Sequence, residues 1–566
     1  MPDFRRLARI TLLPVLVGLA GALLAQAFVG AVDALGDWLR LTPDSRSSVD
    51  AGTLVALTLS VPALAGLVVG LLRRFAAPGT HEGPAEVIEA VQTRRGGMRG
   101  WSGLKSGLAS LVSLGGGASA GEYGPMVHLG GSAGAGMARW FGEDVTTANN
   151  AMACGVAAAI STVFNAPLAG ILFAHEIVLR HFSPRAFAPV AVASIMGYVV
   201  SNHRTLREPL LQVDGVPPPA LWEFLPFLVL GALAAVVSIA YMTAILRAGR
   251  LARRMPMPAV LVPAAAGLAL GALALLVPDV LGIGVEALKR TLNEPALSWG
   301  TGALLVAKIA GTALCLGFGF AGGAFSPALL IGSLFGLVFG GLLELLGLPV
   351  SSLTTYAICG MMAVAAPVIG APVTAVVLTM EMTASYPMTL AALAAVALSN
   401  LVAARRFGRS LFDRQLRERH LDLSAGRTKA VLDTRTVRPL VSEHYIAAGE
   451  NASVDEILPR MLAQGLVQAF LVDGEGRYRG SVRLRDAVSG RGNQKAIELR
   501  DRDAVVVRAD FSVWRTMQRM KRFVGESVAV VDEEGRLAGA LYETDLIQSY
   551  LAIEEELRAE EQIASR

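Results

Sequence analysis

Two glycine-rich turns in apolar surroundings have the residues to bind an anion. They are Gly121-Glu122-Tyr123-Gly124-Pro125 and Gly323-Ala324-Phe325-Ser326-Pro327, and an apolar, helix-like run follows each. Proline is favoured in the first turn of a helix, and glycine lets the backbone bend sharply beside a ligand. Such a turn directs free N–H groups and the positive end of the helix dipole at one point. We therefore expect an anion site that contains no lysine or arginine. Such a site binds its ion weakly enough to release it readily.

The two turns belong to an internal repeat. Ala120–Gly130 aligns with Gly322–Gly332 at an offset of 202 residues, and Asn165–Glu176 aligns with Gly370–Glu381 at an offset of 205 residues. A single Gly-Pro pair is more simply a kink in a packing helix, whereas two matches in one order at one offset indicate duplication. Duplicated halves are typical of transporters, whose substrate site lies between the repeats.

These turns lie among long apolar segments of the sequence. Of the 566 residues 53% are hydrophobic and only 17% are charged, against about 25% charged in soluble proteins. Up to about residue 404 the chain alternates polar breaks with runs that approach the ~20 residues of a membrane span. The runs include Ile10–Val32, Leu54–Leu72, Phe227–Leu246, Ala259–Val277 and Leu390–Ala404.

The flanks of these runs predict their orientation. The first run imitates a secretory signal, but its length and the many runs after it favour an uncleaved first helix. Arg253-Arg254 and Arg405-Arg406 are typical of cytoplasmic loop ends. The tail follows the second pair, so we expect a multi-pass protein of the cell membrane with a cytoplasmic tail.

Composition and spacing argue against several other classes of protein. The net charge of +4 is too small to indicate nucleic-acid binding. Cys154, Cys315 and Cys359 stand apart in apolar segments, as packing residues do. The membrane part has no metal-ligand spacing, nucleophile–base set or nucleotide loop, and it lacks the carboxylate cluster of a cation transporter. We expect neither an enzyme nor a required cofactor or metal.

Residues 1–415 resemble the CLC family of chloride channels and transporters. The resemblance rests on both turns, with the family's phenylalanine at Phe325, on the string Asn165–Phe173, and on Gly370-Ala371-Pro372. It implies an all-α polytopic membrane domain of two inverted repeats and a homodimer with one pore in each subunit. It also implies that the permeating ion is chloride or a similar small anion.

The chain departs from this family at the residues that line the pore. His81 stands where the family has a serine that contacts the ion, and Phe412 stands where a late tyrosine does so. Tyr123 replaces a glutamate that closes the pore and carries protons. Glu122 replaces the arginine before that glutamate, and Ile177 replaces a second, proton-relaying glutamate.

These departures predict anion movement without proton coupling. A carboxylate is itself an anion that competes for the site, and burial can raise its pKa from about 4.3 toward neutrality. A tyrosine, with a pKa near 10, stays neutral. We therefore predict a passive channel or uniporter. The alternatives are an anion/proton antiporter that uses Glu122, Glu176 or His81, and a sensor whose pore does not conduct.

Several side chains have two interpretations each. The Tyr123 hydroxyl faces the anion, or its ring plugs the path or packs against Phe325. His81 gains charge below pH ~6.5, or it stays neutral and hydrogen-bonded. Glu176 and Glu381 are structural helix residues, or they admit protons, because acids inside a membrane are candidates for function.

The sequence of the soluble tail predicts a pair of α+β modules. After a linker at 416–436, the segments 437–495 and 496–553 each contain a helix, a strand, a turn, a strand and a helix, and a charged helical tail occupies 554–566. The two segments resemble a pair of CBS modules, which many CLC proteins carry.

In CBS modules an aspartate at the start of a helix binds a nucleotide ribose, and a hydroxyl residue three positions earlier meets phosphate. Asp486 and Asp545 match that aspartate, whereas Arg483 and Tyr542 replace the hydroxyl residue. Binding of an adenine nucleotide is therefore one interpretation of the pair that the resemblance leaves open. The alternatives are that the aspartates cap their helices and that the pair is structural or dimerising.

Overall fold

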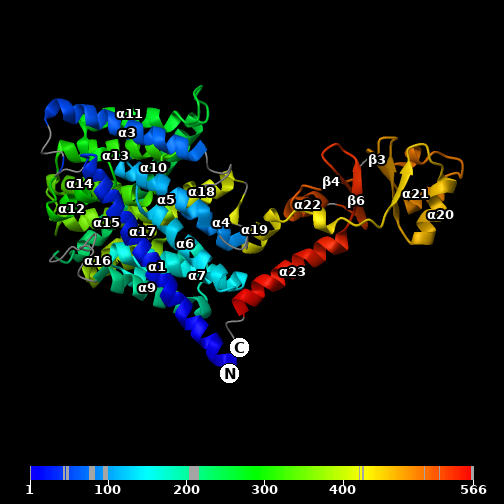
Figure 1. Ribbon diagram of the computed structural model, residues 1–566, viewed down its shortest axis with the longest axis horizontal. Coiled ribbons are helices and arrows are strands. Elements are labelled where there is room, and N and C mark those ends of the chain that lie inside the picture. Colours follow the sequence, from blue (N-terminus) through cyan, green and yellow to red (C-terminus); the bar gives the residue numbers. More distant parts are fainter. Residues whose placement is uncertain are drawn as a thin grey trace. The chain divides into compact units, whose positions relative to one another are not determined.

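The computed structural model describes residues 2–41, 45, 50–74, 83–93, 98, 100–202, 216–419, 421–423, 426–501, 504–521 and 523–562. The chain forms two compact units, Met1–Glu418 and Arg419–Arg566 (Figure 1). The first is helical, and the second contains all six strands of the described part.

The helical unit consists of two sets of helices in the same order. The first set is α1 (Pro2–Trp38), α3 (Ala51–Arg74), α4 (Pro84–Thr93), α5 (Gly100–Gly115), α6 (Tyr123–Trp140), α7 (Val145–Phe164), α8 (Pro167–Phe173), the π-helical η1 (Ala174–Leu179) and α9 (Pro184–Asn202). The second set is α10 (Phe224–Ala252), α11 (Val262–Leu276), α12 (Val285–Asn293), α13 (Trp299–Gly317), α14 (Phe325–Leu345), α15 (Leu353–Ile369), α16 (Pro372–Thr383) and α17 (Tyr386–Arg406), and α18 (Leu411–Glu418) follows it.

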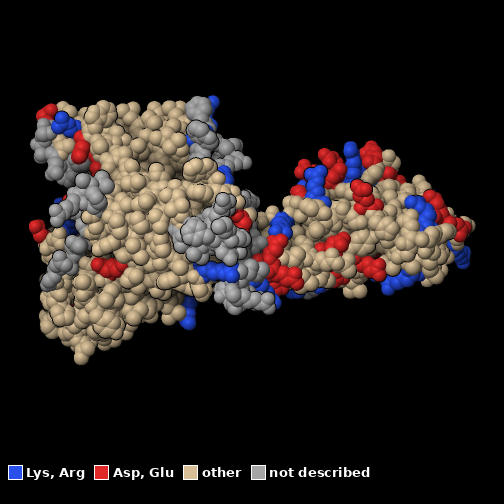
Figure 2. Space-filling model, turned by 60° about the horizontal axis from the view of Figure 1, so that its bottom comes forward, with Lys and Arg blue, Asp and Glu red and all other residues tan. Residues whose placement is uncertain are grey.

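Seven helices of the described part are long and apolar enough to cross a membrane. The predicted run Ala259–Val277 is not among them, because α11 has only 15 residues. Pro278 directly follows Val277, the last residue of the predicted run. A proline disfavours helical geometry at the residue before it. On the face in Figure 2 the surface of the helical unit is almost free of charged side chains, whereas they are frequent on the second unit.

Glycines set the closest helix contacts, and these contacts repeat. A Cβ on Gly130 of α6 would lie 2.4 Å from the carbonyl oxygen of Gly155 in α7. A Cβ on Gly332 of α14 would lie 2.5 Å from the carbonyl oxygen of Gly360 in α15. Only glycine permits such an approach of two backbones. The two contacts are equivalent in the two repeats, which supports the duplication predicted from the sequence.

Two short helices begin in the same way in both repeats. α7 ends at Asn165 (φ +54°) and α15 ends at Gly370 (φ +77°), both in the left-handed region. Pro167 and Pro372 then open α8 and α16 at the first helical position. Both starts agree with proline's preference for the first turn of a helix.

The second unit has two three-stranded sheets of the same topology. In the first sheet β2 (Gln468–Val472) lies parallel to β1 (Ile446–Gly449) and antiparallel to β3 (Tyr478–Arg483). In the second, β5 (Ser527–Val531) lies parallel to β4 (Val506–Arg508) and antiparallel to β6 (Leu537–Tyr542). The helices are α19 (Arg427–Thr434), α20 (Val454–Gln464), α21 (Leu484–Ser489), α22 (Val513–Met520) and α23 (Glu543–Gln562).

The predicted strands, hairpins and preceding helices are therefore confirmed, and three details differ. α19 lies inside the predicted linker 416–436, because Val431 and Leu432 are buried in the core of the second module. α23 runs through the predicted boundary at residues 553 and 554 as one helix. Asp486 and Asp545 are third residues of their helices, which excludes the alternative that they are N-cap residues.

Candidate functional site

The two glycine-rich turns meet inside the helical unit. The Gly121 N–H donates to the Gly323 carbonyl at 2.7 Å, and the Gly323 N–H donates to the Gly121 carbonyl at 2.6 Å. This pair of bonds forms an isolated antiparallel bridge. Helices α6 and α14 begin two residues later, at Tyr123 and Phe325, so their N-terminal ends lie beside each other.

The approach of the turns requires glycine. A Cβ on Gly323 would lie 2.7 Å from the backbone nitrogen of Gly124, and a Cβ on Gly124 would lie 3.0 Å from the Cα of Gly323. A Cβ on Gly121 would lie 2.5 Å from the Oγ of Ser326. Any side chain at these positions would push the turns apart. Because both helix ends carry partial positive charge, their meeting point is the best candidate for an anion site.

Tyr123 fills this meeting point with its ring. The side chain is only 2% exposed. Its ring lies parallel to that of Phe164, with centroids 4.3 Å apart, and edge-on to that of Phe325, with centroids 5.0 Å apart. The packing of Tyr123 against Phe325 was one of the two interpretations of this residue. Phe164 was not predicted, although it directly precedes the string Asn165–Phe173.

Hydroxyl groups surround the second turn. The Tyr241 hydroxyl of α10 donates to the Ala324 carbonyl at 2.9 Å, and the Ala321 N–H donates to Ser113 Oγ at 3.0 Å. These bonds fix the turn's backbone. The Ser326 hydroxyl is buried and has no hydrogen-bond partner among the described residues. It is therefore a donor available to an ion beside the turns.

A carboxylate also lies at the first turn. Glu122 is the N-cap residue of α6 and is only 1% exposed. Further along α6, the buried His128 ring places Nε2 3.0 Å from Oε2 of Glu86 in the first turn of α4. The pair joins α4 to α6. No local sequence pattern predicts this pair, because 42 residues separate its members.

Of the remaining predicted pore residues, Phe412 lies in α18 and His81 lies outside the described part. Phe412 is 6% exposed in the first turn of α18. Its neighbour Ser410 packs against Gly370, where a Cβ would lie 2.8 Å from the serine Cβ. His81 lies outside the residues that the structure describes, so its predicted place in the anion pore stays a prediction.

Two glutamates cap helices of the opposite repeat. The Glu381 carboxylate of α16 accepts the N–H groups of Leu168 and Ala169 in α8, both at 2.7 Å. The Glu176 carboxylate of η1 accepts the N–H groups of Val373 and Thr374 in α16, at 3.2 and 2.9 Å. Each carboxylate thus satisfies backbone donors at a helix N-terminus and interacts favourably with its dipole. These contacts give both acids a structural role.

The proton-relay position next to Glu176 is apolar and enclosed. Ile177 is 3% exposed. Three residues later Arg180 ends η1, and its Nη2 lies 2.8 Å from Oδ1 of Asp413 in α18. This ion pair connects the end of η1 with the first turn of α18.

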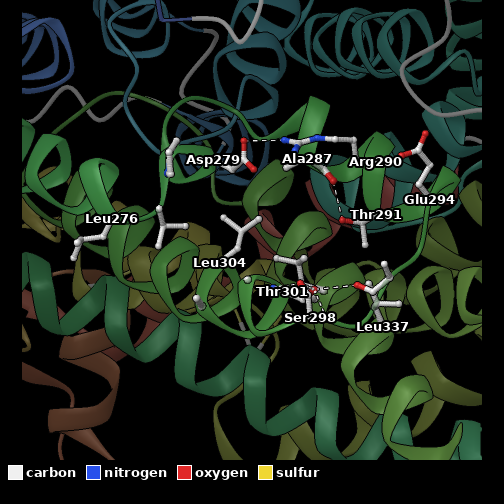
Figure 3. Close-up of a pocket in the computed structure, with 16 residues that line it drawn as sticks. Leu276, Asp279, Ala287, Arg290, Thr291, Glu294, Ser298, Thr301, Leu304 and Leu337 are labelled. Carbon is white, nitrogen blue, oxygen red and sulfur yellow. Dashed lines mark hydrogen bonds and ion pairs between the residues drawn. The ribbon is translucent and has the colours of Figure 1, made fainter. Parts of the chain in front are cut away.

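A pocket of about 460 Å³ lies away from the turns (Figure 3). Its lining includes Thr301 and the ion pair of Asp279 and Arg290, whose Nη2 and Oδ1 lie 2.8 Å apart. The pocket touches α14 at Leu334, which lies ~14 Å along the helix from Phe325. It therefore belongs to a different part of the helical unit.

The second unit has its own pocket, of about 570 Å³. Arg483 and Arg485 line it together with Asp501 and Glu526, and Arg483 forms an ion pair with Asp501. The lining charges therefore balance. Apolar side chains, among them Phe523, make up most of the remaining lining.

The other predicted nucleotide residues lie elsewhere. Asp486 is not part of the lining and pairs with Arg485, with Nε and Oδ1 3.3 Å apart. Tyr542 donates its hydroxyl to the His444 carbonyl at 2.7 Å, and Asp545 lies in the first turn of α23. Of the four predicted residues, the structure brings only Arg483 to the pocket.

The described residues contain no group of three histidines, cysteines or acids that could hold a metal ion. The three cysteines are buried and free, which agrees with the predicted packing role.

Comparison with known proteins gives two family matches. The family described as voltage gated chloride channel matches residues 64–404, and the CBS domain matches residues 437–491 and 496–552. A putative chloride channel protein ClcB-like of Ralstonia nicotianae is 31% identical over 382 residues, which cover 66% of this chain and 89% of that protein. The H(+)/Cl(-) exchange transporter ClcA of Vibrio cholerae is 31% identical over 430 residues, which cover 72% of this chain and 89% of the transporter.

Solved structures share the fold. A slow cyanobacterial Cl-/H+ antiporter aligns with a TM-score of 0.67 and 23% identity over 73% of this chain and 98% of its own. A eukaryotic CLC transporter aligns with a TM-score of 0.63 and 19% identity over 95% of this chain and 98% of its own. The helical unit therefore has the two-repeat architecture of these transporters.

Proposed function

Since this chain belongs to the family of voltage-gated chloride channels, we propose that it moves chloride or a similar small anion passively, without coupling to protons. Anion transport is the activity of the family, and the chain is a multi-pass membrane protein with a cytoplasmic CBS pair. The passive mode and the preferred ion are the parts that we propose.

The position of Tyr123 carries the proposal. A neutral ring lies at the meeting point of two helix N-termini, stacked on Phe164 and buried. A phenol neither replaces an anion at a positive site nor exchanges protons near neutrality, because its pKa is near 10. Ile177 offers no proton acceptor at the second relay position. Both steps by which protons would follow the anion therefore lack a titratable group.

The capping glutamates support the same conclusion. Glu176 and Glu381 each accept two backbone N–H groups. These bonds hold each carboxylate in place at the N-terminus of a helix of the other repeat. Both acids therefore serve as helix caps, and neither is placed as a mobile proton carrier.

One experiment tests the proposal. The purified protein is reconstituted in liposomes with a chloride gradient, and chloride efflux and internal pH are recorded together. We expect chloride efflux that needs a potassium ionophore for charge balance and leaves internal pH unchanged. The ClcA exchanger of Vibrio cholerae is the positive control for proton movement. Proton movement in a fixed ratio to chloride would refute passive transport, and absence of any anion flux would instead support a non-conducting sensor.

Glu122 favours a second candidate, an anion/proton antiporter. Its carboxylate is buried, and Glu122 directly precedes Tyr123 in the first turn. It is therefore the acid closest in sequence to the point where the turns meet. If protons move with chloride, Glu122→Gln will abolish the proton movement and leave chloride flux. If protons do not move, the same variant will change chloride flux alone.

For the assembled protein we propose a homodimer with one pore in each subunit, following the family. We also propose that the pocket at Arg483 is where an adenine nucleotide would bind to the CBS pair. The balanced charges of Arg483, Arg485, Asp501 and Glu526 favour the adenosine moiety over the phosphates. Calorimetry with adenosine and ATP tests this: adenosine should bind at least as tightly as ATP, and Arg483→Ala should weaken both.

A further inference from the structure

The pocket between α12, α13 and α14 has a charged side and an apolar side (Figure 3). Its volume is about 460 Å³, and the end of α11 also contributes to its lining. In Figure 3 the side chains of Asp279, Arg290 and Glu294 lie on one side. Those of Leu276 and Leu304 lie across from them. A ligand with a charged end and an apolar end would match both sides.

The pocket lies near the extracytoplasmic surface of the membrane. Arg253 and Arg254 directly follow α10, and such basic pairs are typical of cytoplasmic loop ends. α11 then spans ~22 Å, so its last residue, Leu276, lies close to the opposite surface. Leu276 is 81% exposed, and Trp299, which stands between two residues of the lining, is 97% exposed. Exposed tryptophan is typical of the level of the lipid headgroups. The pocket therefore lies where headgroups lie.

The charged side of the pocket can accept further hydrogen-bond partners. Arg290 Nη2 lies 2.8 Å from Oδ1 of Asp279, and 58% of the arginine side chain is exposed. A guanidinium has five N–H donors, so a phosphate can still bind to Arg290. Glu294 is the exposed C-cap of α12, where the negative end of the helix dipole also favours a cation. The lining thus offers one group to a phosphate and two carboxylates to a cation.

The two carboxylates favour a primary ammonium over a quaternary one. An ionised carboxylate only accepts hydrogen bonds, and a primary ammonium has three N–H donors. The nitrogen of choline has none. A headgroup that carries a phosphate alone would leave Asp279 and Glu294 without a cation. The chemistry of the lining therefore favours a zwitterion that joins a phosphate to a primary amine.

We propose that this pocket binds one molecule of phosphatidylethanolamine from the extracytoplasmic leaflet. The phosphate of the lipid accepts hydrogen bonds from Arg290, and its ammonium group donates to Asp279 and Glu294. The beginning of an acyl chain packs against Leu304 and Leu337, which belong to the same lining. This binding goes beyond the proposed anion transport and does not depend on it.

Native mass spectrometry of the full-length protein in detergent measures this binding. The protein is titrated with phosphatidylethanolamine, phosphatidylcholine and phosphatidylglycerol that carry the same acyl chains. We expect a dissociation constant on the order of tenfold lower for phosphatidylethanolamine, because only this lipid supplies both charged groups with N–H donors. Equal affinity for the three lipids would overturn the proposal. Displacement of the lipid by an equal concentration of soluble phosphoethanolamine would overturn the assignment to a lipid.

Two substitutions of α12 test the charged side. Arg290→Gln and Glu294→Gln should each raise the dissociation constant for phosphatidylethanolamine on the order of tenfold. Lys289→Gln and Glu286→Gln are the matched controls, because this pair lies on the same helix but outside the lining, with Nζ and Oε1 3.5 Å apart. Both controls should bind the lipid as the wild type does. Equal losses in controls and test variants would show that the lipid responds to surface charge alone, against the proposal.

A substitution of α13 tests the cavity without changing any charge. Ala303 is exposed and lines the pocket, so Ala303→Trp fills the cavity and should abolish the binding of phosphatidylethanolamine. Val306 is 66% exposed on the same helix and lies outside the lining, so Val306→Trp should bind the lipid normally. Both variants should elute from size-exclusion chromatography as the wild type does. Full binding in Ala303→Trp, or equal loss in Val306→Trp, would place the lipid elsewhere and overturn the proposal.

Discussion

The Tyr123 ring lies parallel to the Phe164 ring, with centroids 4.3 Å apart and planes 8° apart. Stacking of two rings stabilises an aromatic pair by about 0.5–1.5 kcal/mol beyond the burial of its surface. The ring therefore has a defined position, which its contact with Phe325 restricts further. The first of four predictions follows from this position of the ring.

Removing the Tyr123 ring should speed anion flux, whereas removing only its hydroxyl should not. Tyr123→Phe keeps the stacking on Phe164, so we expect chloride efflux from liposomes close to that of the wild type. Tyr123→Ala empties the meeting point of the turns, so we expect faster efflux together with a loss of stability of about 3 kcal/mol. Slower efflux in both variants would instead show that the hydroxyl contacts the ion.

The contact between the turns should not tolerate a methyl group. In Gly323→Ala the new Cβ meets the Gly124 backbone at 2.7 Å, so we expect loss of anion flux and a lower melting temperature. Gly136→Ala is the control in α6, because nothing lies within 4 Å of its Cβ. It should keep its flux and gain about 0.5–1 kcal/mol of helix stability. Unchanged flux in Gly323→Ala would place the anion path elsewhere.

The buried Ser326 hydroxyl should contribute to anion affinity. Ser326→Ala removes a donor beside the turns, and loss of such a donor costs about 1–3 kcal/mol. We expect a five- to hundredfold rise, roughly, in the chloride concentration for half-maximal flux. Ser333→Ala is matched, since Ser333 is also buried in α14 with its hydroxyl unpartnered among the described residues. Similar changes in the two variants would argue against an ion contact at Ser326.

The capping glutamates should act on stability and not on protons. Glu176→Gln and Glu381→Gln keep an acceptor oxygen but lose the charge at a helix N-terminus. We expect each to lower stability by about 1–2 kcal/mol, measured by thermal unfolding in detergent. Glu344→Gln, at an exposed position near the end of α14, should change stability little. A normal melting temperature with altered proton movement would reverse the assignment for either residue.

The sequence predicted the helix starts, because proline and glycine determine the backbone locally. Pro125 and Pro327 lie in the first turns of α6 and α14, and Gly370 has the positive φ that ends α15. These properties belong to single residues. The same reasoning correctly predicted the strands and turns of the CBS pair.

Contacts between distant segments were beyond that reasoning. The stacking of Phe164 on Tyr123 depends on how α6 and α7 pack, and the ion pair of Arg180 and Asp413 depends on where η1 meets α18. No local sequence pattern marks the residues of either contact. The alternative that Asp486 caps its helix is excluded for a related reason, because the helix begins two residues earlier than the motif implied.

The exchange of caps between the repeats makes the two halves depend on each other. Glu176 belongs to the first repeat and completes a helix of the second, while Glu381 does the reverse. Either half alone would have a carboxylate without its helix and a helix without its carboxylate. The ends of α8 and α16 are therefore complete only when both halves have folded against each other.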